Sequence, residues 1–169
     1  SDVYKRQDLS RMLQTDVKVK FQEGDYVNSK LTSPDSEWDI NDFHNVDLLV
    51  DHEDYVYTQY TEDPSLLEGI IRERDLEQKF YSGLLKSNCR VTSQPDWGDV
   101  FIYIKSKTAI DAHSIKNYVI SYRDECHFHE EICECFYKRL KDAFNPSELL
   151  VMCLYLSLIH ISEPTRLST

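Results

Sequence analysis

The stretch DVFIYIKSKTAIDAHSIKNYVISYR, residues 99–123, decides the fold class because it joins a strand pattern directly to a helix pattern. Phe101–Ile104 (FIYI) consists of aromatic and β-branched residues, which favour a strand. Asp111 is a residue type that caps helices, and the apolar positions after it predict a helix that runs to about Tyr122. Together the two elements indicate a domain of the α+β class.

Further elements are predicted on both sides of this stretch. Alternating or β-rich residues predict strands at Val17–Phe21, Tyr55–Tyr60 and Leu149–Tyr155. Apolar residues at helical spacing predict a helix at Ser65–Arg74, with the serine as its cap, and a second helix from about His129 to Phe144, ended by the Asn-Pro pair at 145–146.

The composition limits the classes of partner. The 169 residues include 30 acidic and 19 basic ones, for a formal charge of −11, which argues against direct nucleic-acid binding and against anionic membrane surfaces. The longest apolar run, Leu149–Ile161, is interrupted by polar residues and is shorter than the ~18 residues of a membrane-spanning helix. Five irregularly spaced cysteines, without a signal-peptide pattern, favour reduced thiols in the cytoplasm.

The segment Leu85–Gly98 (LKSNCRVTSQPDWG) places Cys89 seven positions before Asp96. A thiol beside a carboxylic acid can perform covalent chemistry, and the polar, turn-forming neighbours are unusual around a core cysteine. The alternatives are that Cys89 is a small buried apolar residue and that Asp96 caps a turn or helix. Downstream, Phe128, His129 and Glu130 form a second short motif.

These two motifs, in this order, resemble the active-site segments of the QueF family, nitrile reductases that convert 7-cyano-7-deazaguanine (preQ0) to 7-aminomethyl-7-deazaguanine (preQ1). The similarity is greatest to the long, two-module form. The resemblance implies a tunnelling fold (T-fold), in which an antiparallel sheet carries two helices on one face and several modules join into a barrel. It also implies that Lys79–Leu85 is a strand that ends near Cys89, and that the protein is a homo-oligomer, a dimer for the long form.

The resemblance further implies a role for each residue of the two motifs. Cys89 would add to the nitrile carbon of preQ0 and form a thioimide, while Asp96 protonates the nitrogen. His129 would bind substrate and supply or position another proton, and Glu130 would accept hydrogen bonds from the deazaguanine edge. Two NADPH molecules would supply hydrides, no metal is needed, and the product would enter queuosine biosynthesis for tRNA modification.

The two ends of the chain differ from the family. Residues 1–7 and 157–169 resemble translated adapter sequence, and we expect both to be non-native; the alternative for the tail is a native apolar strand with a disordered end. Residues 8–62 would be the end of a first T-fold module with its linker, and residues 63–156 the second, catalytic module. The family's first-module motif and its NADPH-contacting tail have no counterpart, so cofactor residues stay unassigned and we expect poor turnover.

Three other functions compete with nitrile reduction. Cysteine and histidine residues between 126 and 135 could hold zinc, as in the T-fold GTP cyclohydrolases, but Cys133 and Cys135 would point about 200° apart on one helix. Cys126 with His129, or His129 with Cys133, would give only a partial site. A cysteine amidohydrolase would use Cys89 with His129 as its base. A T-fold module without catalytic activity is the third alternative.

Overall fold

The computed structural model of the protein describes residues 30–32, 37–39, 42–50, 56–156, 161–162 and 165–168. The chain divides into two compact units, Ser1–Asp42 and Phe43–Thr169. The first unit contains an antiparallel pair of short strands, β1 (Lys30–Thr32) and β2 (Glu37–Asp39). The strand predicted at Val17–Phe21 lies outside the described residues, and the module boundaries placed at residues 63 and 156 stay predictions.

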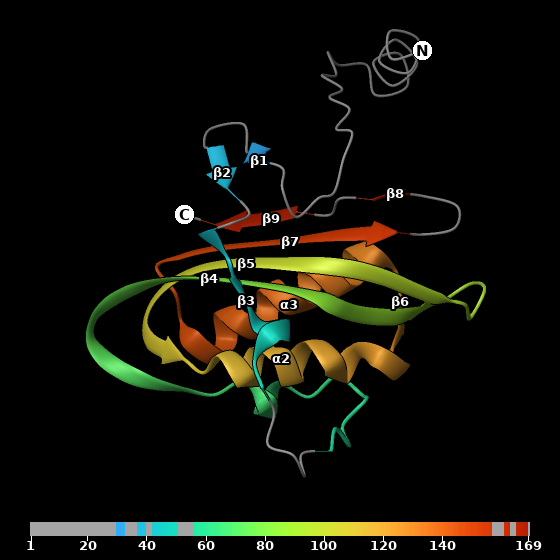
Figure 1. Ribbon diagram of the computed structural model, residues 1–169, viewed down its shortest axis with the longest axis horizontal. Helices are drawn as coiled ribbons and strands as arrows, with labels where there is room; N and C mark the ends of the chain where they lie inside the picture. The colour runs from blue at the N-terminus through green and yellow to red at the C-terminus, as the bar shows by residue number, and fades with distance from the viewer. Residues whose placement is uncertain are drawn as a thin grey trace, which may run out of the picture. The chain divides into compact units, whose positions relative to one another are not determined.

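The second unit is built on three long neighbouring strands that run antiparallel, β4 (Gly69–Cys89), β5 (Pro95–Ile110) and β7 (Glu148–Leu156) (Figure 1). These contain the strands predicted around residues 79–85, 101–104 and 149–155, so all three predictions are confirmed. Four short strands extend the sheet. Two pair in parallel with β4, namely β3 (His44–Asn45) and β6 (Cys126–His127); two pair antiparallel with β7, namely β8 (Ile161–Ser162) and β9 (Thr165–Ser168).

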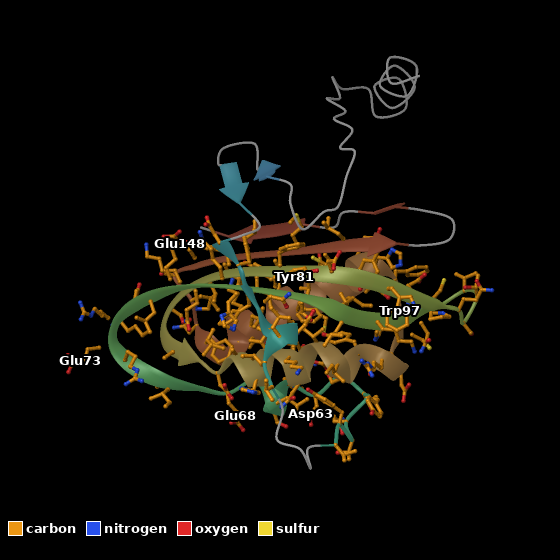
Figure 2. All side chains as sticks on the ribbon, in the orientation of Figure 1. Asp63, Glu68, Glu73, Tyr81, Trp97 and Glu148 are labelled. Atoms are coloured by element: carbon orange, nitrogen blue, oxygen red, sulfur yellow. The ribbon has the colours of Figure 1, made fainter. Side chains whose placement is uncertain are left out.

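The helix predicted at Ser65–Arg74 is wrong. A 3-10 turn covers Pro64–Leu66, capped by Asp63, and β4 begins at Gly69. Pairing of β4 with β5 determines the structure here, despite the helical spacing of the apolar residues. Gly69 lies so close to β5 that a Cβ atom added to it would meet the Thr108 side chain at 2.5 Å. Of the apolar positions that suggested a buried helix face, Leu66 and Leu67 pack against the core before the strand begins, and Ile70 and Ile71 are exposed in β4. Figure 2 shows Glu73 at the left of the view, where β4 curves, at the opposite end of the strand from Trp97 and the hairpin turn.

The strand predicted at Tyr55–Tyr60 is also wrong for the residues that the structure describes, 56–60. This segment is extended but pairs with no strand there; instead, the carbonyl of Tyr60 accepts a hydrogen bond from the Asp124 N–H at 2.9 Å. The Lys116 ammonium group lies over the Tyr57 ring, 5.9 Å from its centroid. The segment 56–60, whose aromatic residues favoured a strand, therefore contacts the helical layer instead.

Both helices predicted after β5 are confirmed. Helix α2 (Ala112–Ile120) begins after Asp111, whose carboxylate accepts a hydrogen bond from the His113 N–H at 3.2 Å, and a 3-10 turn, Ser121–Asp124, continues it. Helix α3 (His129–Phe144) ends at Asn145, which adopts a left-handed conformation with φ of 42° before the proline.

The core lies between the sheet and these helices, which cover the same face (Figure 1). Buried residues of β5 oppose buried residues of β7 in register: Val100 with Cys153, Ile102 with Val151, and Ile104 with Leu149. Tyr118 of α2 and Phe136 of α3 pack edge to face with their ring centroids 5.1 Å apart. The predicted α+β class with two helices on one face is confirmed. The three long strands are antiparallel as predicted, but the sheet as a whole is mixed, because β3 and β6 pair in parallel with β4. None of the described helices has the length and apolar character needed to cross a membrane.

Candidate active site

Cys89 occupies the last position of β4, where the hairpin turns back into β5. Its N–H donates to the Gln94 carbonyl at 2.8 Å, and its carbonyl accepts from the Ser93 N–H at 2.8 Å, so the five residues between the strands form a closed loop. Ser93 has a φ of 56°, a left-handed conformation that this closure requires. The loop fixes the backbone on both sides of the thiol, which is partly exposed.

The loop also lowers the pKa of the Cys89 thiol. The hydroxyl of Thr92 makes the largest contribution, followed by the backbone N–H groups of Thr92 and Val91, while burial and the Asp96 carboxylate act in the opposite direction. Donors that point at a sulfur stabilise its anion, as in other backbone anion sites. The thiolate, which is the nucleophilic form, is therefore more populated near neutral pH than in an ordinary cysteine.

We expect Thr92→Val to raise the pH at which Cys89 is alkylated at half its maximal rate, because the main donor to the thiolate is lost. Iodoacetamide labelling between pH 5 and 10, followed by peptide mass spectrometry, measures this midpoint. Thr92→Ser retains a hydroxyl and should restore the wild-type midpoint. An unchanged midpoint in Thr92→Val would mean that Thr92 does not activate the thiol.

Asp96 lies on the same face of the sheet as Cys89. The β4–β5 register places Asp96 opposite Ser87, and Cys89 follows Ser87 by two residues, so the thiol and the carboxylate are diagonal neighbours. Such neighbours have backbones about 7–8 Å apart and side chains that converge. Asp96 is 7% exposed and belongs to a strand rather than to a turn.

His129 contacts the Asp96 carboxylate from the helical layer. It is the first residue of α3, and its Nε2 atom lies 3.0 Å from the Asp96 Oδ2 atom. The short strand β6 explains this approach, because His127 pairs with Cys89 and so brings the start of α3 beside the end of β4. The imidazole also stacks on the Tyr155 ring, with centroids 3.9 Å apart and planes within 2°.

Glu130 and Glu131 have different environments although they are adjacent. The Glu131 carboxylate accepts the Phe128 N–H at 2.9 Å and pairs with Arg90 at 3.0 Å. These two contacts, with a smaller effect of His127, lower the pKa of Glu131. Glu130 is exposed and forms no hydrogen bond or ion pair with the described part of the chain. Glu131 therefore caps the helix, and the Glu130 carboxylate is available to a ligand.

The residues that could have formed a zinc site are engaged elsewhere. The His127 Nε2 atom contacts Glu125 at 2.8 Å, and the buried Cys133 thiol faces the Val151 carbonyl at 3.7 Å. Cys126 is exposed, and Cys135 lies farther along α3. Within the ranges that the structure describes, no group of three or more histidine, cysteine or acidic side chains is arranged to hold a metal ion.

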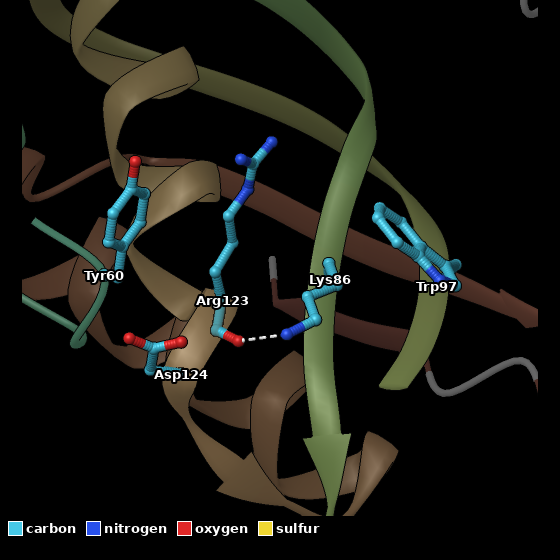
Figure 3. Close-up of a pocket in the computed structure, with 5 residues that line it drawn as sticks. All are labelled: Tyr60, Lys86, Trp97, Arg123 and Asp124. Carbon is cyan, nitrogen blue, oxygen red and sulfur yellow. Dashed lines mark hydrogen bonds between the residues drawn. The ribbon is translucent and has the colours of Figure 1, made fainter. Parts of the chain in front are cut away.

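A shallow pocket of about 280 Å³ lies near this end of the sheet but contains none of the predicted site residues. Its lining residues are Tyr60, Lys86, Trp97, Arg123 and Asp124 (Figure 3). Lys86 and Trp97 are register partners adjacent to Ser87 and Asp96, so they face the opposite side of the sheet from the Cys89 thiol. The Lys86 ammonium group donates to the Arg123 carbonyl at 2.7 Å.

The sequence motifs indicated Cys89, Asp96, His129 and Glu130, and the structure brings the first three together around one hairpin end. They did not indicate Thr92 or Tyr155. A threonine three positions after a cysteine is a local signal that could have been used, because closure of the loop turns it back toward the thiol. The contact of Tyr155 with His129 depends on strand register, which no local pattern gives.

Comparison with known proteins identifies one matching family model and several similar curated proteins. Residues 95–157 match a family model described as QueF-like protein. The chain is 32% identical over 152 residues to the NADPH-dependent 7-cyano-7-deazaguanine reductase of Psychrobacter cryohalolentis, an alignment that covers 88% of this chain and 52% of that protein. It is 39% identical over 108 residues to the protein of the same name from Paraburkholderia xenovorans, covering 64% and 39% respectively.

The chain thus spans about half or less of the length of these curated relatives. Among solved structures, the apo form of the archaeosine synthase QueF-Like is similar with a TM-score of 0.49 and 22% identity, over 56% of this chain and 92% of that one. The family match includes Asp96, His129, Glu130 and Tyr155, and the curated relatives extend the similarity over most of the chain. This chain is thus similar to the QueF-like family over residues 95–157 and to NADPH-dependent 7-cyano-7-deazaguanine reductases over most of its length.

Proposed function

We propose that the protein reduces the nitrile of preQ0 to the primary amine of preQ1 with NADPH, through a covalent thioimide on Cys89, as a step of queuosine biosynthesis. The observation that carries this proposal is the arrangement of an activated thiol diagonal to a buried carboxylate that is itself paired with a histidine. The names of the curated relatives, NADPH-dependent 7-cyano-7-deazaguanine reductases, support the substrate and the reductant.

Addition of the thiol is the first step. A nitrile carbon is a weak electrophile, and the negative charge collects on its nitrogen as the sulfur attacks. With the carbon about 3–3.5 Å from the Cys89 sulfur, the diagonal spacing leaves the nitrogen directed toward Asp96. One sulfur–carbon bond forms, one π bond of the nitrile breaks, and a proton goes to nitrogen, which gives a neutral thioimide.

The proton for this step comes from Asp96 and His129 acting as a unit. The His129 Nε2 atom lies 3.0 Å from the Asp96 Oδ2 atom, a distance over which a proton can pass between the two side chains. Asp96 faces the nitrile nitrogen and delivers the proton, and His129 then passes its own proton to Asp96. The same pair can supply a proton to nitrogen during the later reduction.

NADPH supplies one hydride to the thioimide carbon and a second hydride to the imine that remains after the thiol leaves. The chain's own contribution is to hold the carbon on Cys89 until the first reduction and to provide protons at nitrogen. Two NADPH molecules are consumed for each nitrile, and Cys89 is regenerated as the sulfur–carbon bond breaks. We assign none of the described residues to the cofactor.

Glu130 would recognise the base. An ionised carboxylate accepts hydrogen bonds with both oxygens, and the deazaguanine edge offers a ring N–H and an exocyclic amino group side by side. Glu130 is exposed at the first turn of α3, next to His129, and Glu131 already performs the capping role. Because Glu131 caps the helix, recognition of the base is favoured over helix stabilisation as the role of Glu130.

We expect Glu130→Gln to weaken preQ0 binding by about 10- to 150-fold, because one charge-assisted acceptor becomes a donor. Calorimetry on the Cys89→Ala background measures reversible binding without adduct formation. Glu131→Gln is the matched control: it should lower the melting temperature through loss of the negative charge that pairs with Arg90 at the helix N-terminus, and leave affinity within about twofold. Equal affinity losses in the two variants would contradict the recognition role of Glu130.

We further propose a homo-oligomer in the cytoplasm. Strand β4 pairs on its outer edge only through two residues of β3 and two of β6 within the described chain, and Ile70 and Ile71 are 63% and 80% exposed. An open sheet edge with exposed apolar side chains favours association with another module. The five free cysteines agree with a reducing compartment.

Intact-mass spectrometry after incubation with preQ0 tests the proposed function. We expect a mass increase of one whole substrate molecule, because addition of a thiol to a nitrile expels nothing. NADPH should then remove the adduct only slowly, because the family's NADPH-contacting tail has no counterpart in this sequence. A folded chain that binds preQ0 reversibly, and whose Cys89 reacts with iodoacetamide, but that gains no mass would contradict the thioimide mechanism.

A further inference from the structure

We propose that Tyr155 is a positioning residue for His129, and that the absence of a side chain at Gly98 creates the space that this role requires. The proposal rests on the proposed function only for its predicted effect on the rate of preQ0 adduct formation. The geometric part concerns the orientation of one imidazole ring and can be measured without substrate.

The His129 ring is held by two contacts that restrain different motions. Its edge is fixed by Asp96, because Nε2 lies 3.0 Å from Oδ2. Its face lies on the Tyr155 ring, with centroids 3.9 Å apart and planes within 2°. The contact with Asp96 restrains the position of Nε2, and the stack on Tyr155 restrains the tilt of the ring.

Tyr155 can serve as a fixed support because it is itself buried and placed by the sheet. It is 1% exposed, and it lies on β7 opposite Gly98 of β5, two residues along the strand from Asp96. Tyr155 and Asp96 therefore belong to adjacent, hydrogen-bonded strands, whereas His129 belongs to helix α3. The sheet fixes the distance between the two groups that hold the imidazole.

Gly98 makes room for this stack. A Cβ atom at that position would lie 3.0 Å and 3.2 Å from two carbons of the Tyr155 ring and 2.9 Å from the Leu154 carbonyl oxygen. The last atom belongs to the backbone of the paired strand, so β5 and β7 would have to move apart locally, and the Tyr155 ring would move with its strand. Any larger residue at Gly98 would therefore displace Tyr155, and with it the face on which His129 rests.

The aromatic ring of Tyr155, rather than its hydroxyl, performs this role. The hydroxyl is buried and has no hydrogen-bond partner of ordinary geometry in the described part of the chain; the same is true of the Ser87 hydroxyl. Burial raises the pKa of Tyr155 well above its usual range, with a weak contact to Ser87 opposing it, so the phenol stays protonated. Phenylalanine should consequently replace tyrosine without loss of the positioning role.

The test compares Tyr155→Phe, Tyr155→Leu and Gly98→Ala. The NMR signal of the His129 Cε1–H group, assigned through its loss in His129→Gln, reports the stack by its ring-current shift. We expect the shift to persist in Tyr155→Phe, to disappear in Tyr155→Leu and to change in Gly98→Ala. The rate of preQ0 adduct formation at saturating substrate should fall about a hundredfold in Tyr155→Leu, with the dissociation constant within about threefold.

Two variants serve as matched controls. Tyr122→Leu removes an equally buried tyrosine, stacked on Phe136 with centroids 4.7 Å apart, and should lower stability without moving the His129 signal. Gly83→Ala introduces a Cβ 3.0 Å from the Tyr81 hydroxyl, in contact with neither Tyr155 nor His129. These controls separate a positioning effect from general loss of stability.

An unchanged His129 signal in folded Tyr155→Leu would overturn the proposal, as would an equal loss of rate in Tyr122→Leu. If Tyr155→Leu does not fold, Gly98→Ala decides: a wild-type signal and rate in that variant would overturn it. Should the wild-type chain form no adduct, the proposed function fails, but the NMR shifts still establish whether Tyr155 orients His129.

Discussion

Replacing Cys89 with alanine is expected to abolish the preQ0 adduct completely, because no other described thiol combines a lowered pKa with a neighbouring acid. The covalent step requires the sulfur atom itself, and no other side chain can substitute for it. Reversible binding should survive, since Glu130 and the remaining side chains around the site are unchanged. Intact mass and calorimetry on the same preparation distinguish these two effects.

Cys126→Ala is the matched control. Cys126 is the strand partner of Asn88, one residue before the proposed nucleophile, and it is more exposed than Cys89. Its removal should leave the rate and extent of adduct formation unchanged. If Cys89→Ala still gains the mass of preQ0 while Cys126→Ala does not, the nucleophile has been assigned to the wrong cysteine.

Asp96→Asn should slow adduct formation by about 10²–10⁴-fold, the range of general acid catalysis. Asparagine has nearly the shape of aspartate and can still form a hydrogen bond with His129, so the change removes proton delivery with little disturbance of packing. The time course of the mass increase at saturating preQ0 measures the effect. Reversible binding, measured on the Cys89→Ala background, should change far less than the rate.

A half-buried carboxylate on the same strand provides the control for Asp96. Asp99 accepts the Tyr81 hydroxyl at 2.9 Å on the other face of the sheet, and burial raises its pKa. Asp99→Asn should therefore perturb stability without slowing addition to the nitrile. A wild-type rate in Asp96→Asn would show that the proton comes directly from solvent, and the proposed role of Asp96 would be wrong.

Much of the sheet and both helices could be predicted because their signals are local. An aspartate at the N-cap, an Asn-Pro stop and runs of β-branched residues act within a few positions of themselves. The failure at Ser65–Arg74 has a non-local cause. Its apolar residues do show helical spacing, but β4 extends past the core and pairs with the far end of β5, leaving Ile70 and Ile71 exposed. Only the pairing partner could reveal that.

The site shows the same division between local and non-local signals. Motif similarity indicated Cys89 and Asp96, and the strand register explains why they lie close together. Asn88 pairs with Pro95 at the end of the hairpin, so Cys89 and Asp96 each lie one residue from this pair. The contact of His129 with Asp96 follows from the motif only once β6 is known to pair with β4. The support from Tyr155 could not be predicted, because a buried tyrosine on a strand is typical of any core.

The most direct test of the central claim is to follow the nitrile carbon itself. PreQ0 labelled with ¹³C at the nitrile should, when added in slight deficit to the wild-type chain, lose its nitrile resonance and give one new signal in the region of sp²-hybridised thioimide carbons. Cys89→Ala should show the nitrile resonance unchanged apart from broadening on binding. A nitrile resonance that persists in the wild-type complex at saturating protein would contradict the account, because the base would then be bound without the sulfur–carbon bond on which the proposed reduction depends.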